Sequence, residues 1–325
     1  MKQGISKPVA WSWVALLLAA VLMGWLGLAL WFQYPHARPV AVILPMMGFG
    51  AIALERMKGA RFVWGLLSVL LVLIVLWWAT IQPHQDRNWA QPVAHGVEGV
   101  IEGKLVTLTH VRDFRWRTPD KAEARWITKI VDLDKLVSVD FVRTVWASEH
   151  IAHTMISFGF SDGQYVVFSA EIKREEHETF SELGGFFKQF ELVLIGATED
   201  DIVRLRTHAR NEDVSLYRLN LTPRQAQALF LSYVDLGNDL AKTPRFYKTI
   251  TSNCTTMIWK LARQVKPGLP MDWRVLLSGH SQDYLYDIGA ISNDRPLAQI
   301  KAEAPITAKA RALPEGADYS AEIRS

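Results

Sequence analysis

The first eighty residues carry long apolar runs separated by short polar connections, a pattern that the rest of the chain lacks. Residues 14–32 and 62–81 are almost wholly apolar, and each is about as long as a helix that crosses a bilayer. Residues 40–54 form a shorter apolar run that contains Pro45 and two glycines. The pattern predicts transmembrane helices for the two long runs. The short run either crosses as well or only dips into the membrane.

The charged flanks decide between these options, because short cytoplasmic loops retain Lys and Arg. The relevant cations are Lys2 and Lys7 before the first run, Arg38 after it, and Arg56, Lys58 and Arg61 after the second. Three crossings place both larger groups of cations inside, whereas two would leave the second group outside. We therefore predict three transmembrane helices with residues 82–325 on the outer face, the periplasm if the cell is Gram-negative. A cleavable signal peptide fits less well, because the first run is long and lacks a small-x-small cleavage site.

Beyond residue 82 the periodicity is that of a mixed domain. Two short strands are expected within residues 99–114, a charged loop at 115–125, and further strands at 192–195 and 214–219. Runs at 154–160 and 165–172 flank Ser161-Asp162-Gly163-Gln164, which predicts a β-hairpin.

Two helices follow with clear boundaries. Thr222-Pro223-Arg224-Gln225 combines an N-cap, a proline at the first helical position and a glutamine three residues after the cap, and Pro244 ends the helix. The second begins near Ser252-Asn253 and ends before Pro267. The outer region is therefore expected to be an α+β domain around a small sheet, with an N-terminal β extension.

Charge excludes one class of partner. The chain has 36 Lys and Arg against 33 Asp and Glu, but six of the basic residues and one acid lie in residues 1–81, so the remainder carries 30 basic and 32 acidic side chains. A net charge of 30 − 32 = −2 does not provide the basic field that nucleic acid requires. We expect no nucleic-acid partner.

Cys254 is the only cysteine, which excludes an intramolecular disulfide and a thiolate metal cluster. A free thiol outside the cytoplasm risks oxidation, so it is either buried or chemically used. Cys254 lies in the first turn of the second expected helix, where the free N–H groups and the helix dipole favour a thiolate. A small buried apolar residue is the alternative interpretation.

A thiol nucleophile needs an imidazole to take its proton. Of the nine histidines, His153 is the candidate because it opens an expected strand, which is a rigid support for a base. A core or edge histidine is equally consistent with this pattern. His150 and His153 do not suit a metal pair, because positions i and i+3 of a strand face different ways. Gly279-His280-Ser281 lacks the motif of a serine hydrolase.

The ordered series of motifs resembles the Lnb-type lipoprotein N-acyltransferases, over roughly residues 97–290. These enzymes look like the permuted papain-like (NlpC/P60-like) group, in which His precedes Cys. The motifs are His153-Thr154-Met155-Ile156-Ser157-Phe158-Gly159-Phe160, Glu171-Ile172-Lys173-Arg174-Glu175, Arg204-Leu205-Arg206-Thr207, Tyr217-Arg218-Leu219, Asn253-Cys254-Thr255-Thr256 and Asp272-Trp273-Arg274.

The resemblance implies Cys254 as nucleophile and His153 as base. A third group should orient the imidazole, and Glu171 is the candidate if Phe160 pairs with Gln164, whereas a two-residue turn would bring Ile172 opposite His153. Ser169 and Glu175 remain open. Asn253 either shapes an oxyanion site or caps the helix, and capping is favoured.

The resemblance also implies a fold, a function and a location. It does not include the membrane helices: the apolar runs alone make residues 1–82 a membrane anchor, with 83–140 as a connector and β extension. The resemblance implies that residues 141–325 are a papain-like thiol domain, which this topology places in the periplasm on the bacterial inner membrane. It would move an acyl chain from a phospholipid, through a thioester on Cys254, to the α-amino group of a diacylated lipoprotein, without cofactor or metal. A membrane-anchored cysteine peptidase or amidase acting on cell-wall peptides, and a non-enzymatic membrane scaffold, are the alternatives.

Overall fold

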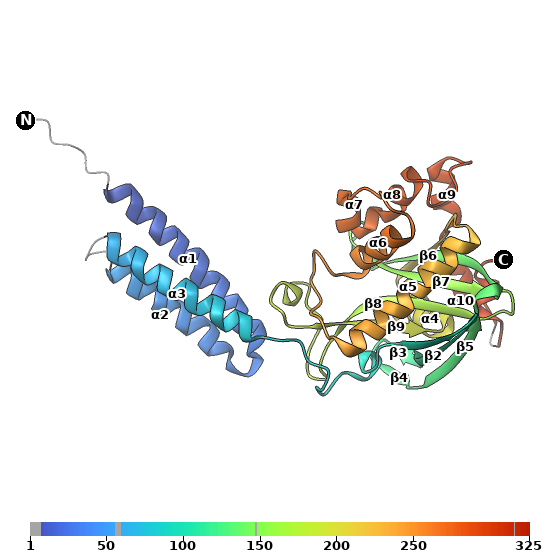
Figure 1. Ribbon diagram of the computed structural model, residues 1–325, viewed down its shortest axis with the longest axis horizontal. Helices are drawn as coiled ribbons and strands as arrows, with labels where there is room; N and C mark the ends of the chain where they lie inside the picture. Colours follow the sequence, from blue (N-terminus) through green and yellow to red (C-terminus); the bar gives the residue numbers. More distant parts are fainter. Residues whose placement is uncertain (1–7, 56–59, 147, 315) are drawn as a thin grey trace, which may run out of the picture. The chain divides into compact units, whose positions relative to one another are not determined.

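The computed structural model describes residues 8–55, 60–146, 148–314 and 316–325 (Figure 1). The chain forms two compact units. One consists of Met1–Pro83 with Phe180–Gln189, and the other of His84–Thr179 with Phe190–Ser325. The expected division at residues 82 and 140 stays a prediction.

The first unit is a bundle of three helices, α1 (Pro8–Gln33), α2 (Arg38–Glu55) and α3 (Ala60–Thr80). Within the described residues, all three are long and apolar enough to cross a membrane, with mean hydropathies of 2.3, 1.3 and 2.5. The short middle run is thus helical throughout, and Pro45 lies inside it. Among the cations used to orient the helices, Lys2, Lys7, Arg56 and Lys58 lie outside the described residues, as does the side chain of Arg61.

The second unit is built on one mixed sheet, which contains eight strands within the described residues. Its order is β1-β2-β9-β8-β7-β6-β10, with β5 paired to β2. Every pairing is antiparallel except β2 with β9. The strands are β1 (Glu98–Glu102), β2 (Leu105–Arg112), β5 (Trp126–Asp132), β6 (Leu136–Val145), β7 (His153–Phe160), β8 (Tyr165–Lys173), β9 (Glu191–Ala197) and β10 (Asp213–Arg218).

The structure corrects two expectations about the sheet. The segment 115–125 is not a loop but a hairpin of β3 (Arg115–Thr118) and β4 (Lys121–Glu123), in which Arg115 and Glu123 lie opposite each other. Strands β5 and β6 were not foreseen, and they make the sheet large rather than small. The expected strands elsewhere, including the 161–164 hairpin, are confirmed.

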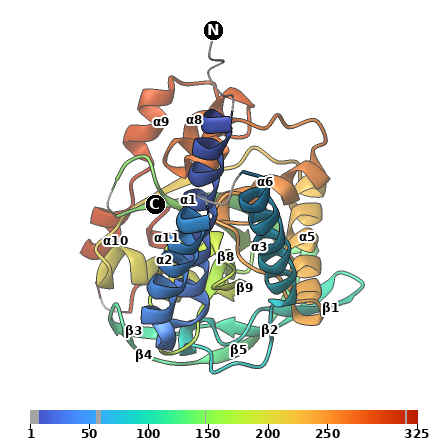
Figure 2. The same cartoon turned by 90° about the vertical axis from the view of Figure 1, so that its left-hand side faces the viewer.

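Helices cover both faces of the sheet, and Figure 2 shows α5 and α6 to one side of β8 and β9 with α10 and α11 to the other. On the first face, α5 (Pro223–Lys242) and α6 (Cys254–Val265) bury an aromatic cluster in which Phe168 of β8 stacks on Tyr233 at 5.0 Å between ring centroids. On the second face lie α4 (Glu199–Arg204) and the π-helical turn η6 (Leu205–Ala209).

The remaining helical elements are η1 (Pro35–Ala37), η3 (Gln91–Val93), η4 (Leu133–Lys135), η5 (Gly184–Phe186), α7 (Trp273–Leu276), η7 (Ser278–His280), α8 (Ser281–Asp287), α9 (Leu297–Glu303), α10 (Thr307–Ala312) and α11 (Tyr319–Glu322). The two helix starts read from the sequence are confirmed. Thr222 and Gln225 form a capping box on α5, and Asn253 and Thr256 form one on α6. In each box, the two side chains accept from each other's backbone N–H groups.

Candidate active site

Cys254 is the first residue of α6. Its backbone N–H belongs to the first helical turn, where the N–H groups have no partner within the helix. The start of α6 is tied to the start of β7 by a 3.0 Å hydrogen bond between the Thr154 and Thr255 hydroxyls, both of which are buried. The thiol is therefore held at a helix amino terminus and against the beginning of a central strand.

His153 opens β7 and lies beside the thiol, close enough for each group to shift the pKa of the other. On its other side, the ring Nε2 lies 2.7 Å from Ser169 Oγ and 3.1 Å from Glu171 Oε1. Because Nε2 is engaged there, Nδ1 is the nitrogen left to face Cys254. The strand thus places the imidazole between a sulfur and a carboxylate.

The hairpin register decides which residue of β8 lies beside His153. Phe160 N–H donates to Gln164 O at 2.9 Å, and Gly159 pairs with Tyr165, so residues 153 and 171 face each other across the two strands. Glu171 and Ser169 both reach the ring, and the Ser169 hydroxyl donates to Glu171 Oε1 at 2.8 Å. Glu175, the other open candidate, instead lies 3.1 Å from Arg87 Nη1.

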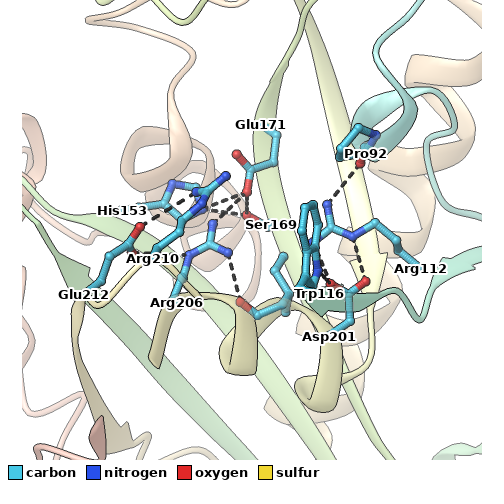
Figure 3. Close-up of polar contacts among 11 residues, drawn as sticks. Pro92, Arg112, Trp116, His153, Ser169, Glu171, Asp201, Arg206, Arg210 and Glu212 are labelled. Atoms are coloured by element: carbon cyan, nitrogen blue, oxygen red, sulfur yellow. Dashed lines mark hydrogen bonds and ion pairs between the residues drawn. The ribbon is translucent and has the colours of Figure 1, made fainter. Parts of the chain in front are cut away.

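Arg206 supports this cluster from η6, on the second face of the sheet; from the sequence it was placed in a family motif without an assigned role. Its Nη2 donates to Glu171 Oε1 at 3.1 Å and its Nη1 to Ile202 O at 2.9 Å (Figure 3). The side chain comes from the π-helical turn η6, a local distortion of the kind frequent at functional sites. Glu212 lies 3.9 Å from Arg206 Nε and completes the arrangement.

A second buried ion pair lies nearby on the same face and has a structural role. Arg112 on β2 binds Asp201 on α4 through two hydrogen bonds of 2.8 and 3.2 Å. Asp201 also accepts hydrogen bonds from Phe114 N–H and from the Trp116 indole (Figure 3). With every carboxylate oxygen occupied, Asp201 fixes α4, and through it the turn that carries Arg206.

The charges of the site reinforce one another. Burial acts to lower the pKa of His153, but the negative charges of Glu171 and Cys254 outweigh it and raise that pKa to about 9. Burial acts to raise the pKa of the Cys254 thiol, but the charge and hydrogen bond of His153 lower it to about 7, helped by Thr154 N–H and the Thr255 hydroxyl. Burial likewise opposes ionisation of Glu171, yet His153 and Arg206 hold its pKa well below the usual range. The arrangement favours a thiolate beside an imidazolium.

Other polar residues singled out in the sequence lie elsewhere. His150 contacts His280, with Nδ1 and Nε2 2.9 Å apart, rather than His153. Within the residues that the structure describes, no three His, Cys, Asp or Glu side chains are grouped so as to hold a metal ion. The Asn253 side chain is used in capping: its Oδ1 accepts from Thr256 N–H at 2.8 Å, and its Nδ2 donates to Thr249 O. The favoured capping role is confirmed.

Fold and site together define an α+β domain that carries a cysteine–histidine–carboxylate cluster and follows three apolar helices. Residues 122–279 match the family model of the Lnb N-terminal periplasmic domain, so this part of the chain is similar to that family. The match includes Cys254, His153 and Glu171, and it confirms the resemblance read from the sequence. Together with the three candidate membrane helices, the match fits a protein of the inner membrane with a periplasmic domain. No curated protein and no solved structure matches the chain.

Proposed function

We propose that the protein is a lipoprotein N-acyltransferase of the bacterial inner membrane, with Cys254 as nucleophile, His153 as acid–base group and Glu171 as its orienting carboxylate. The observation that carries the proposal is the sole thiol, which stands at a helix start beside an imidazole that lowers its pKa and whose Nε2 lies 3.1 Å from Glu171 Oε1. The matched family adds lipoprotein processing as the setting. The bilayer-crossing topology, with three passes and the thiol domain outside, belongs to the same proposal.

In the first half-reaction, the Cys254 thiolate attacks the carbonyl carbon of a phospholipid ester. The oxygen that becomes negative is stabilised by N–H groups at the start of α6. The C–O bond then breaks, and the lysophospholipid oxygen takes the proton of the His153 imidazolium. The products are a thioester on Cys254 and a neutral imidazole.

In the second half-reaction, the α-amino group of a diacylated lipoprotein attacks the thioester carbonyl. His153 accepts the proton that the nitrogen loses, the C–S bond breaks, and the thiolate returns. The sequence is ping-pong, because one product leaves before the acceptor reacts. Both substrates reside in the bilayer, so attachment of the domain to the membrane raises their effective concentration.

Ser169 links His153 to Glu171. Its hydroxyl donates to Glu171, and its oxygen is free to accept from protonated His153 Nε2. Arg206 keeps Glu171 ionised, so the carboxylate can stabilise the imidazolium. We assign Ser169 and Arg206 positioning roles, because both act through Glu171 and His153 rather than on the thiol.

The test is intact-mass measurement of the full-length protein after incubation with phospholipid vesicles. A hydroxylamine-sensitive mass increase of one acyl chain is expected, and it should be absent from Cys254→Ser. Addition of a diacylated lipoprotein should discharge the thioester and leave the lipoprotein one acyl chain heavier at its amino terminus. An unmodified Cys254 in protein whose thiol alkylates rapidly would contradict acyl transfer. Cleavage of cell-wall peptides by that protein would then favour the peptidase alternative, and a slowly alkylated thiol the scaffold.

A further inference from the structure

The segment Phe180–Gln189 lies between β8 and β9 in the chain and belongs to the same compact unit as the apolar helices. Phe187 stacks on Phe32 of α1, with ring centroids 5.3 Å apart and planes inclined by 13°, and contacts Trp25 at 6.0 Å. Trp25 in turn meets Trp78 of α3 edge to face at 4.9 Å. An aromatic cluster therefore joins this segment to the carboxyl-terminal halves of two candidate membrane helices.

Polar contacts hold the same segment to the two helix ends. Gln33, the last residue of α1, donates from Nε2 to Phe187 O and Lys188 O at 2.7 and 3.0 Å. The Lys188 ammonium donates to Trp78 O and Ile81 O at 2.8 and 3.1 Å, and lies 4.9 Å from the centre of the Trp78 ring. A cation at carbonyls that end a helix is stabilised by the helix dipole.

The backbone of Lys188 supports a specific role for these contacts. Its φ of 54° lies in the left-handed region, which is costly for a residue with a side chain. Such a conformation persists where the surroundings impose it, and here it lets one residue cap α3 while its carbonyl binds Gln33. The position of the segment at the helix ends is thus determined by several independent interactions.

Three large apolar side chains of this segment remain outside the packing. Phe180, Leu183 and Phe186 are 60, 59 and 48% exposed, whereas Gly184 and Gly185 between them are buried in the turn η5. They belong to the same unit as helices whose spans end at Gln33 and Thr80. Tryptophans such as Trp77 and Trp78 at the end of α3 are typical of the boundary between lipid and water.

We propose that Phe180, Leu183 and Phe186 insert into the outer leaflet of the bilayer and bind phospholipid acyl chains there. Apolar side chains next to a membrane-spanning helix end gain their burial from lipid, which explains their exposure in the protein alone. Strand β8, which carries Ser169 and Glu171, continues along the chain into this segment. The further statement that the bound lipid is the acyl donor rests on the proposed function.

Depth measurement tests the insertion without any enzymatic assay. In full-length Cys254→Ser protein, which lacks other thiols, single cysteines at positions 180, 183 and 186 are labelled with an environment-sensitive fluorophore and reconstituted in phosphatidylethanolamine–phosphatidylglycerol vesicles. Val137→Cys on β6 is the matched control, because Val137 is also a large apolar residue and is 65% exposed. The three labels should be quenched by lipids with a shallow spin label and protected from iodide, whereas position 137 should show the reverse.

Labels at 180, 183 and 186 that iodide quenches as strongly as at 137 would overturn the proposal. So would labels that neither quencher reaches, because a protein surface or a second copy would then cover them.

A second measurement tests the link to the donor. The triple variant Phe180→Ser, Leu183→Ser, Phe186→Ser should form the acyl-enzyme from vesicle phospholipid about tenfold or more slowly, because the apolar contact is lost. Its Cys254 should keep the normal alkylation rate, which shows an intact site, and Val137→Ser should match the wild type in both assays. An unchanged acylation rate in the triple variant would contradict a role in donor binding. Absence of acyl-enzyme in the wild type would instead count against the proposed function, and the depth result would stand.

Discussion

At the scale of single residues, Cys254 and His153 carry opposite charges only within a limited pH range. The pKa of the thiol is lowered to about 7 and that of the imidazole is raised to about 9, so the thiolate–imidazolium pair predominates between these values. The proposed mechanism requires Cys254 to be deprotonated as the nucleophile and His153 to be protonated as the donor to the leaving oxygen. Both requirements are met in the same range.

The rate of acyl-enzyme formation should therefore have a bell-shaped pH profile. It should rise as Cys254 loses its proton near pH 7 and fall as His153 loses its proton near pH 9, because the leaving group then lacks a proton donor. Alkylation of Cys254 by iodoacetamide needs no acid, so it should rise through the lower value and not fall at the upper one. A bell-shaped pH profile for alkylation would contradict the assignment of the lower pKa to Cys254 and the upper pKa to His153.

The Glu171→Gln substitution should reduce the fraction of molecules that hold the Cys254 thiolate beside the His153 imidazolium. The carboxylate raises the pKa of His153, so its loss should move the upper limb of the profile to lower pH, raise the pKa of the thiol and slow acylation by up to about a hundredfold. The pH dependence of Cys254 alkylation measures this directly. Glu175→Gln is the matched control, because Glu175 pairs with Arg87 and should leave the profile in place.

Arg206→Met should destabilise the domain. Arg206 is 4% exposed and lies between Glu171 and Glu212, so its removal leaves buried carboxylates without their cation, at a cost of about 3–5 kcal/mol. Arg210→Met should lower the free energy of unfolding by at most about 1 kcal/mol. The Arg210 side chain is 43% exposed, and the substitution removes a single contact of 3.8 Å between its Nη1 and Glu212 Oε1. Urea unfolding of both variants gives the comparison, and equal losses would show that burial of the charge is not decisive.

At the scale of elements, the site depends on segments that are distant in sequence. The Ser278 hydroxyl in η7 donates to Ala152 O and accepts from Ala152 N–H, at 2.6 and 2.9 Å, immediately before His153. Gly279 follows, and a Cβ there would lie 1.9 Å from Glu149 O. This close approach requires glycine and fixes where β7 begins.

Gly279→Ala should therefore separate η7 from the start of β7 and displace His153. We expect a loss of about 1–3 kcal/mol in stability and slower alkylation of Cys254 at pH 7.5. The control is Gly96→Ala, whose new methyl group would make ordinary contacts of 3.4 and 3.5 Å with Val193 and Leu194. Thermal unfolding and alkylation rates check both variants, and a stable, fully reactive Gly279→Ala protein would refute the role of this contact.

The same scale shows what the sequence could and could not predict. The starts of α5 and α6 were predictable because Thr222, Gln225 and Asn253 act on their own first turns. Strand β6 was missed: Asp140 is buried in it, and its carboxylate is bound by Arg218 and Arg324 from much later in the chain. Local periodicity contains no sign of such partners.

Some contacts of the candidate site could likewise be predicted from the sequence, and others could not. His153 and Glu171 could be brought together from the sequence, because one hairpin turn sets their register. Arg206 could not, because it reaches Glu171 from a π-helical turn on another layer, and its role exists only once β8 and η6 are packed. The docking of Phe187 and Lys188 on the helix ends likewise depends on contacts across more than a hundred residues.

At the scale of the whole molecule, topology is the main open prediction. Gln33 ends α1 and Trp78 lies at the end of α3, and Phe187 and Lys188 contact both, so the carboxyl ends of these helices lie together. Helix α2 must return the chain between them. This arrangement supports an odd number of crossings.

An alkaline phosphatase reporter fused after Ser325 should therefore be active, since this enzyme folds only outside the cytoplasm. The same reporter fused after Glu55, at the end of α2, should be inactive, because two crossings return the chain to the inside. Activity only in the Glu55 fusion would reverse the assignment, and activity in both would reject α2 as a membrane span.

The presence of a single sulfhydryl has a practical consequence for work on this protein. A chromogenic thiol reagent can consume only one equivalent per chain. At neutral pH, the portion consumed in the fast phase counts the molecules in which the thiol and imidazole are assembled. The competent fraction of any preparation is therefore measurable before a substrate has been identified.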